Sequence, residues 1–93
     1  MPTTITLVHT PACHSCTDAQ TALTELGREF AIRVDLVAAD SDVGQALIGA
    51  HRPAMFPLVL LDGRYFSVGR LPRRKLRALL TARLTARPVG SRS

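Results

Sequence analysis

The feature that most constrains the fold is a run of four apolar residues at positions 58–61, Leu-Val-Leu-Leu, followed directly by Asp62-Gly63. An apolar run without polar alternation is typical of a short strand at the centre of a sheet, buried on both faces. Asp-Gly is a strong signal for a two-residue hairpin turn. Residues 64–68 then read as the returning strand, which Gly69 ends. The chain therefore needs a sheet whose central strand is covered by other elements.

Two further strands are predicted earlier in the chain. Residues 4–9 are rich in β-branched side chains, with Ile5 and Leu7 on one face. Residues 30–37 alternate between apolar and charged side chains. We expect one face of this second strand to carry Ile32, Val34 and Leu36, and the other to carry Arg33 and Asp35.

Three segments show the apolar spacing of amphipathic helices, at i, i+3, i+4 and i+7. The first begins near Cys13 and ends at Gly27, and its apolar positions are Ala19, Ala22, Leu23 and Leu26. The second begins after an N-cap at Asp40 or Ser41 and stops before Pro53, and its apolar positions are Val43, Ala46, Leu47 and Ala50. The third begins at Pro72, and its apolar positions are Leu76, Leu79, Leu80 and Leu84.

The predicted order is β-α-β-α-β-β-α, which indicates an α/β fold with a four-stranded mixed sheet flanked by helices. Strands linked by a helix are expected to pair in parallel, and the hairpin adds an antiparallel edge. We expect the first strand to be central and the fourth to lie at an edge. With 93 residues the chain is long enough for one domain, predicted at 1–87, with a flexible basic tail at 88–93.

Apolar runs of only a few residues are far shorter than the roughly 20 residues of a membrane helix. The N-terminal residues carry no basic charge before a long apolar segment, which argues against a secretory signal peptide. We therefore interpret the chain as cytoplasmic, with no membrane partner. Its two cysteines are too few for a disulfide scaffold, and in such a protein a C-x-x-C pair is more often redox-active or metal-binding.

Cys13 and Cys16 follow a strand and open a helix. The unpaired N–H groups and the positive dipole end of a helix N-terminus favour a thiolate, so we expect the pKa of Cys13 to be lowered. Cys13 is expected to be the more exposed and Cys16 the more buried. Because residues at i and i+3 share a helix face, Cys16 can resolve a mixed disulfide on Cys13 by internal exchange. These two residues are the predicted catalytic pair.

Two alternatives remain open for this pair. The cysteines could form an inert disulfide or remain buried thiols. They could also bind a metal, zinc or an iron–sulfur cluster, together with His9 or His14 or with a second chain. Structural zinc sites take four ligands, and the sequence has no second C-x-x-C or H-x-x-x-H to complete a set.

The segment Thr-Pro-Ala-Cys-His-Ser-Cys at 10–16 resembles the active site of glutaredoxins and of the glutaredoxin-shaped redoxins that reduce ribonucleotide reductase. Two later segments match in order, Met-Phe-Pro at 55–57 and Ser-Val-Gly-Arg-Leu-Pro at 67–72. The resemblance covers residues 4–86 and implies a thioredoxin-like fold of glutaredoxin type and a dithiol–disulfide oxidoreductase. It also implies a cis Phe56–Pro57 bond opposite the cysteines. By position, the resemblance places Phe56 and Pro57 along the substrate groove and Gly69 and Arg70 near its end. Pro11 and His14 complete the predicted substrate-binding residues. His14 lies between the cysteines, where it is expected to tune the Cys13 thiolate more than to act as an obligatory proton donor.

The sequence departs from glutaredoxins where those proteins bind glutathione. His9 and Thr10 stand where glutaredoxins carry a basic residue, and Leu71 follows Gly69-Arg70 in place of an aspartate. The electron donor is therefore left open between glutathione, another low-molecular-weight thiol and a flavin reductase such as thioredoxin reductase. We expect a monomer with no tightly bound cofactor, acting on a disulfide-bearing protein or a small thiol.

Charge is distributed unevenly along the chain. Residues 1–69 carry a net charge of −3, whereas residues 70–93 hold seven Arg, one Lys and no acid. This basic segment is interpreted as a solvated face, as a docking site for an acidic partner, or as a nucleic-acid contact. No aromatic residue follows Phe66, which makes base stacking, and hence a nucleic-acid partner, the weaker interpretation.

Overall fold

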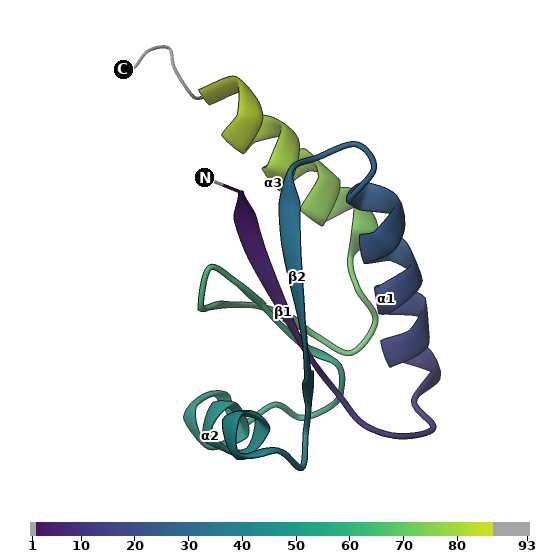
Figure 1. Ribbon diagram of the computed structural model, residues 1–93, viewed down its shortest axis with the longest axis vertical. Helices are drawn as coiled ribbons and strands as arrows, with labels where there is room; N and C mark the ends of the chain where they lie inside the picture. The colour runs from purple at the N-terminus through teal and green to yellow at the C-terminus, as the bar shows by residue number, and fades with distance from the viewer. Residues whose placement is uncertain (1, 87–93) are drawn as a thin grey trace.

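The computed structural model describes residues 2–86 (Figure 1). The elements in chain order are β1 Thr3–His9, α1 His14–Leu26, β2 Ile32–Ala38, α2 Asp42–His51, β3 Leu58–Leu61, β4 Arg64–Val68 and α3 Arg73–Ala86. This order confirms the predicted β-α-β-α-β-β-α pattern. The predicted tail at 88–93 and the domain boundary at residue 87 lie outside the described residues.

The four strands form one mixed sheet in the order β2-β1-β3-β4. β1 pairs with β2 in parallel, with Ile5 opposite Val34, and with β3 antiparallel, with Leu7 opposite Val59. β1 is therefore an inner strand and β4 an edge strand, as predicted. The expectation that helix-linked strands pair in parallel holds for β1 and β2 but is wrong for β2 and β3. The chain leaves α2 and enters β3 in the reverse direction, beside β1 instead of β2.

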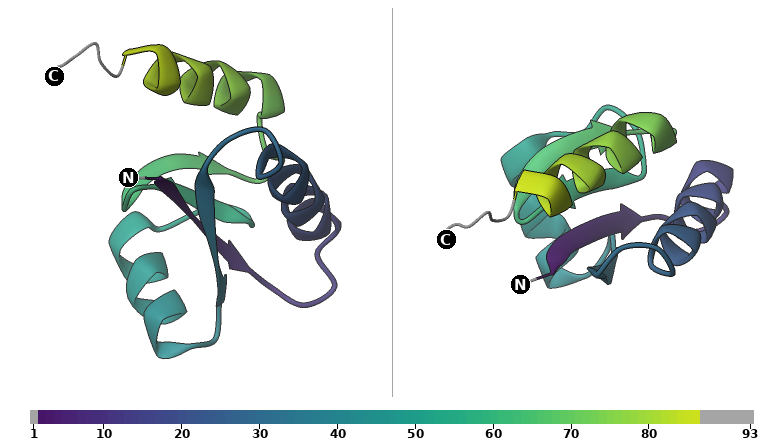
Figure 2. Two further views of the ribbon diagram at one scale, coloured as in Figure 1. Left: turned by 45° about the horizontal axis from the view of Figure 1, so that its top comes forward. Right: turned by 90° about the horizontal axis from the view of Figure 1, so that it is seen from above.

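Helices cover both faces of the sheet, α1 and α3 on one face and α2 on the other (Figure 2). The face under α1 and α3 holds the larger core. Its buried residues are Ile5, Leu7, Ala19, Ala22, Leu23, Leu26, Val59, Leu61, Phe66, Leu71, Leu76 and Leu80. The face under α2 holds the smaller core, whose buried residues are Val8, Leu58 and Leu60. All four residues of β3 are buried, as its unbroken apolar run predicts.

The predicted stripe of α1 is confirmed at all four positions, since Ala19, Ala22, Leu23 and Leu26 are buried. Gly27 caps the helix, and its N–H donates to the carbonyl of Leu23. In α3, Leu76 and Leu80 are buried and Leu79 packs at the margin of the larger core, while the side chain of Leu84 is outside the described part. The α3 helix begins directly after Pro72, whose carbonyl accepts from Leu76 N–H at 3.0 Å.

The predicted apolar stripe of α2 is wrong. Val43 is 60% exposed, Ala46 and Ala50 are also exposed, and Gly44 is the buried residue of the helix. A Cβ on Gly44 would overlap the carbonyl oxygen of Ala38 and lie 2.9 Å from that of Ala39. The helix therefore packs through its smallest residue against the turn before it. This close approach rotates Val43 into solvent and leaves Leu47 against the smaller core.

Ser41 is the N-cap of α2, which decides between the two predicted candidates. Its hydroxyl accepts from Gly44 N–H at 3.0 Å and donates to the carbonyl of Ala38 at 2.6 Å. The second hydrogen bond ties the cap to the end of β2. It thereby sets which residue of the first helical turn faces the sheet.

Leu36 lies on the predicted face of β2, in register with Ile32 and Val34, but 53% of its surface is exposed. Ile32 and Val34 pack on the larger core and Val37 on the smaller core. The larger core therefore covers β2 at Ile32 and Val34 but does not reach Leu36.

The β3–β4 hairpin turns at Asp62 and Gly63, which both have positive φ, 49° and 83°. This is the backbone of a type I′ turn, as the Asp-Gly pair predicts. Asp62 also joins three elements: its carboxylate accepts from Thr4 N–H at 2.8 Å and from Arg83 at 2.7 Å. The hydrogen bond from Thr4 and the neighbouring Arg83 lower the pKa of Asp62. A shift in the register of β3 against β4, between Val59 and Leu60, marks a bulge.

No helix in the described part of the chain is long and apolar enough to cross a membrane.

Candidate active site

The C-x-x-C segment lies where β1 gives way to α1. β1 ends at His9, and the chain turns through Pro11 and Ala12 before the helix begins at His14. Ala12 has φ of 52°, in the left-handed region that a non-glycine residue seldom adopts. Cys13 follows with extended backbone angles and is the N-cap of α1. The strand-to-helix junction predicted for the cysteines is therefore present.

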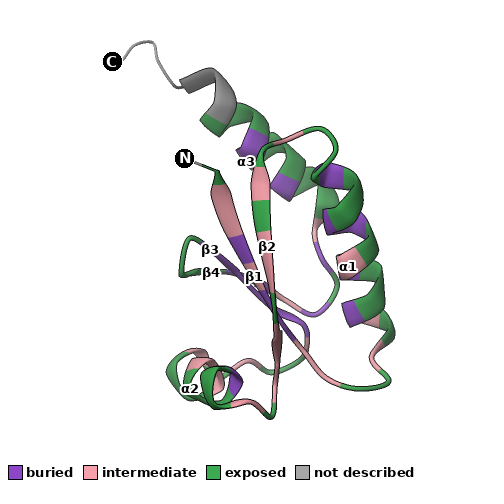
Figure 3. Ribbon diagram, in the orientation of Figure 1, coloured by how far each residue is buried: buried purple, intermediate pink, exposed green. Residues whose placement is uncertain are grey.

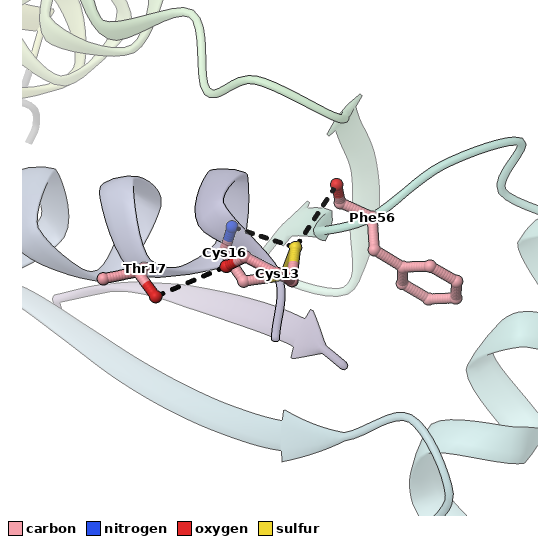
Figure 4. Close-up of a disulfide and its surroundings, with 4 residues drawn as sticks. All are labelled: Cys13, Cys16, Thr17 and Phe56. Carbon is pink, nitrogen blue, oxygen red and sulfur yellow. Dashed lines mark hydrogen bonds between the residues drawn. A yellow bond between two sulfur atoms is a disulfide. The ribbon is translucent and has the colours of Figure 1, made fainter. Parts of the chain in front are cut away.

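Cys13 and Cys16 are joined as a disulfide, with their Cα atoms 5.2 Å apart (Figure 4). Cys16 is 2% exposed and belongs to the buried side of α1, whereas Cys13 is only half-buried. The exposures therefore differ in the predicted direction. One sulfur is open to a partner and the other is enclosed by the helix.

The cap of α1 is built from Cys13 itself. Its Sγ accepts a hydrogen bond from Cys16 N–H at 3.1 Å, the bond that a serine or aspartate usually provides at an N-cap. Its carbonyl accepts from the N–H of Thr17 at 3.1 Å and from the Thr17 hydroxyl at 3.3 Å. A sulfur in this position receives one of the backbone donors that the first turn of a helix leaves unpaired.

The Phe56–Pro57 bond is cis, as the family resemblance implies. Pro57 is buried, and the carbonyl oxygen of Phe56 lies 3.9 Å from Cys13 Sγ (Figure 4). The Phe56 ring packs against the smaller core. The loop before β3 thus meets the cysteine pair from the end of the sheet opposite the Asp62 turn.

Gly69 connects the end of β4 to this loop. Its N–H donates to the carbonyl of Pro57 at 3.0 Å, and its φ of 72° is in the region that favours glycine. A Cβ at this position would overlap the sulfur of Met55. The Met55 side chain therefore lies directly over Gly69, although 55% of its surface is open to solvent.

Of the predicted substrate-binding residues, Phe56 approaches Cys13 through its carbonyl oxygen, and Gly69 is hydrogen-bonded to Pro57 in the same loop. Pro11 is exposed in the turn before α1, and His14 is the exposed first residue of that helix. Arg70 is exposed and lines a separate cavity beside α1. Met55 belongs to the Met-Phe-Pro motif but is not among the predicted substrate-binding residues, because no residue pattern indicates its contact with Gly69, fourteen residues later.

That cavity has a volume of about 480 Å³ and lies between α1 and the segment that leads into α3. Its lining residues are Asp18, Ala19, Arg70, Leu71, Pro72, Arg73, Arg74 and Lys75. It begins within one helical turn of Cys16. Four cationic side chains and one carboxylate give it a positive charge.

Within residues 2–86, no three His, Cys, Asp or Glu side chains come together in an arrangement that could hold a metal ion. In the described chain, the two cysteines therefore have neither His9 nor His14 arranged with them as a third ligand.

No protein-family model matches the sequence, and no curated protein matches it. Solved structures do match the fold. A thioredoxin-like protein from Clostridium perfringens has a TM-score of 0.71 at 14% identity, over 87% of this chain and 70% of its own. A mutant thioredoxin from Halobacterium salinarum NRC-1 has a TM-score of 0.67 at 20% identity, over 86% of this chain and 73% of its own. Oxidized mitochondrial thioredoxin 3 from Saccharomyces cerevisiae has a TM-score of 0.64 at 17% identity, over 85% of this chain and 76% of its own.

The chain therefore has a thioredoxin-like α/β fold, with a C-x-x-C disulfide at the start of its first helix. At these identities the similarity concerns the fold. The chemistry has to be argued from the residues of this chain.

Proposed function

We propose that this protein is a dithiol–disulfide oxidoreductase, a glutaredoxin-like electron carrier that reduces disulfides of proteins or small molecules. The observation that carries the proposal is the asymmetry of the cysteine pair. Cys13 is half-buried and its sulfur caps a helix, whereas Cys16 is 2% exposed and lies inside the first turn. One cysteine is suited to attack and the other to release the product.

The surroundings of Cys13 favour the thiolate in the reduced protein. Cys16 N–H points at Sγ from 3.1 Å, and the positive end of the α1 dipole acts in the same direction. The Phe56 carbonyl oxygen opposes a negative charge, but from the longer distance of 3.9 Å. Since electrostatic interactions weaken with distance, we expect the N–H donor and the helix dipole to prevail and to lower the pKa of the Cys13 thiol.

The reaction proceeds by two thiol–disulfide exchanges. The Cys13 thiolate attacks one sulfur of a substrate disulfide, forms a mixed disulfide with it, and the other substrate sulfur leaves as a thiolate. Cys16 then loses its proton and attacks Cys13 Sγ. This step closes the Cys13–Cys16 disulfide and releases the second substrate thiolate. Two electrons pass from the protein to the substrate, and each departing thiolate takes up a proton according to its own pKa.

We assign the walls of the substrate site to Pro11, His14, Phe56, Pro57, Gly69 and Arg70. Pro11 and His14 lie close to Cys13 along the chain, and the Phe56 carbonyl oxygen approaches its sulfur. Gly69 is hydrogen-bonded to Pro57, and Arg70 would extend the site toward α3. His14 is exposed beside the attacking sulfur and tunes its reactivity without being required for it. The oxidised pair is reset by a low-molecular-weight thiol or a flavin disulfide reductase. We further propose that the protein acts as a cytoplasmic monomer with no tightly bound cofactor.

The experiment that tests this function compares two serine variants in single-turnover reduction of a peptide disulfide. Cys16→Ser retains the attacking sulfur, so it is expected to accumulate a mixed disulfide that mass spectrometry detects on Cys13. Cys13→Ser is expected to lose activity by at least about a thousandfold, because the buried Cys16 is poorly placed for the first attack. Thr21→Ala, on the exposed face of α1, is the control and keeps the native rate.

Three results would contradict the proposal. Native activity in Cys13→Ser would show that the first attack does not use this sulfur. A pair that no thiol reduces would indicate a structural disulfide. Thiols that react only after addition of a chelator would favour a metal site.

A further inference from the structure

The cavity beside α1 is lined by four cationic side chains, of which the proposed substrate site uses only Arg70. We call it the basic groove, defined by the eight lining residues given above. A second, smaller cavity of about 210 Å³ shares Arg73 and Arg74 with it. The segment that joins β4 to α3 runs along α1 here (Figures 1 and 2). Arg73 and Arg74 therefore lie between two adjoining hollows along one side of α1.

The arginines of the groove differ from Arg77 and Arg83 of the same helix region in that they form no ion pair with a carboxylate of the described residues. Arg77, at the far end, makes two hydrogen bonds to Glu29, at 2.6 and 2.7 Å. Arg83 is likewise paired, with Asp62. Among residues 2–86 no carboxylate pairs with Arg70, Arg73 or Arg74 within 4 Å, and the first turn of α3 contains no acid. Three guanidinium groups of the described chain thus form no ion pair, although the carboxylate of Asp18 lines the same groove and that of Glu25 lines the smaller cavity.

Two segments of the chain link the groove to the proposed active site. Ala19 lines it and follows Cys16 by about one helical turn, which corresponds to a rise of about 5 Å along α1. Arg70 follows Gly69, which is hydrogen-bonded to Pro57 of the loop facing Cys13. A chain whose disulfide lies at Cys13 therefore reaches the arginines within a few extended residues, at about 3.3 Å per residue.

The side chains of the groove favour a carboxylate-bearing protein segment over a nucleic acid. Guanidinium groups bind carboxylates with two parallel hydrogen bonds. Sequence-tolerant nucleic-acid binding uses aromatic side chains for stacking, and the lining residues include none. The carboxylate of Asp18 on the opposite wall would also repel a continuous phosphate backbone. A peptide whose acidic side chains are individually placed can bind the arginines without bringing a negative charge close to Asp18.

We infer that the basic groove binds an acidic segment adjoining the disulfide of the protein that Cys13 reduces. This inference rests on the proposed function. It identifies the partner as a protein with acidic residues within a few positions of its reactive cysteine. Arg73 and Arg74 are the main contacts, and Arg70 assists on the side nearest the cysteines.

The test uses two peptides with the same intramolecular disulfide, one followed by Ala-Ala-Glu-Glu-Glu and the other by Ala-Ala-Gln-Gln-Gln. Pre-reduced protein converts each peptide to its dithiol while Cys13 and Cys16 become the disulfide. At low ionic strength we expect the Glu peptide to react about tenfold faster than the Gln peptide. The difference should fall to about twofold at about 0.5 M salt, because screening acts on exposed charges.

Two double variants with the same change in charge locate the effect. Arg73→Gln/Arg74→Gln is expected to bring the Glu-peptide rate to within about twofold of the Gln-peptide rate, which itself stays unchanged. Arg28→Gln/Arg64→Gln removes two exposed arginines that do not line the groove, and should keep most of the preference. Equal rates for both peptides in the native chain overturn the inference. An equal loss in the two double variants overturns it too, because the preference would then follow net charge alone.

A binding measurement separates this inference from the proposed function. A cysteine-free Glu peptide is titrated into the oxidised native chain and followed by amide chemical shifts. Shifts centred on residues 70–75 support the groove even if no peptide disulfide is reduced, a result that would reject only the proposed function. No shifts there, with both disulfides reduced, reject only the groove. Displacement of the Glu peptide by an equimolar single-stranded oligonucleotide, through Arg73 and Arg74, would reject the acidic partner in favour of nucleic acid.

Discussion

The two faces of the sheet carry cores of very different size. Under α1 and α3 twelve residues of the described chain are buried together, whereas under α2 three are (Figure 3). α1 buries five of its side chains, including Cys16, while the buried residue of α2 is a glycine. Apolar burial is the main source of folding free energy. The face under α1 and α3 therefore supplies most of the stability.

The proposed active site lies between these two faces. Cys16 is buried in α1, the helix that packs on the larger core, whereas Phe56 of the facing loop packs on the smaller one. Regions with few buried contacts open more readily than the rest of a protein. We therefore expect the loop on the smaller core to open more readily than α1, which holds the cysteines.

The largest expected effect separates the two cores directly. Leu23→Ala, in the larger core, should lower the free energy of unfolding by about 2–5 kcal/mol, because it removes a fully buried side chain and leaves a cavity. Leu47→Ala, in α2, should cost about 1 kcal/mol, since Leu47 is only half-buried. Urea unfolding of both variants measures the difference. Equal losses would show that the two faces contribute alike.

A pair of glycines in α2 tests how closely this helix approaches the sheet. Gly44→Ala should destabilise by about 1–3 kcal/mol, since its Cβ would overlap the Ala38 carbonyl oxygen. A Cβ at Gly49 would meet nothing within 4 Å, so Gly49→Ala should stabilise by about 0.5–1 kcal/mol through helix propensity. Thermal unfolding of the two variants should move in opposite directions. A shift in the same direction would mean that α2 does not pack through Gly44.

The same helix shows where sequence reasoning stops. Periodicity correctly predicts the buried residues of α1, because the apolar face of that helix packs along its length on the larger core. In α2 the apolar pattern is equally regular. The buried side of this helix is instead determined by the hydrogen bonds of Ser41 and by the close approach of the Ala38 carbonyl oxygen to Gly44. Both interactions involve the carbonyl oxygen of Ala38, at the end of β2, so they depend on how the chain turns there. The direction of β3 and the bulge at Val59 and Leu60 likewise depend on tertiary packing.

For the proposed active site, as for the fold, the sequence predicts the local features but not the contacts between distant segments. The position of Cys13 and Cys16 at a strand-to-helix junction follows from local patterns. The approach of Phe56 and Pro57 to Cys13 follows only from the family resemblance, because 43 residues separate Cys13 from Phe56. The contact of Met55 with Gly69 and the left-handed Ala12 have no local signal. The charge count reveals the basic segment, but not the cavity that it lines.

The smallest expected effect concerns the ion pair between Asp62 and Arg83, which ties the β3–β4 hairpin to α3. Asp62 has a lowered pKa, so its charge stabilises the fold at neutral pH, and this stability is lost as the pH falls through the carboxyl's titration range. Asp62→Asn retains an oxygen for Thr4 N–H but loses the charge facing Arg83. We expect it to be about 0.5 kcal/mol less stable at about pH 7, a small value because both side chains are half exposed. Unfolding near pH 7 and near pH 3 should show the difference shrinking at the lower pH, and a constant difference would assign it to packing.

The central claim is that Cys13, and not Cys16, is the reactive thiolate. It is tested most directly by reacting the reduced native protein with a small amount of iodoacetamide at several pH values and mapping the modified cysteine. We predict that Cys13 is modified first, with a half-maximal rate at a lower pH than for free cysteine, because Cys16 N–H and the α1 dipole stabilise its thiolate. Modification of Cys16 first, or of Cys13 with the pH dependence of free cysteine, would contradict this claim.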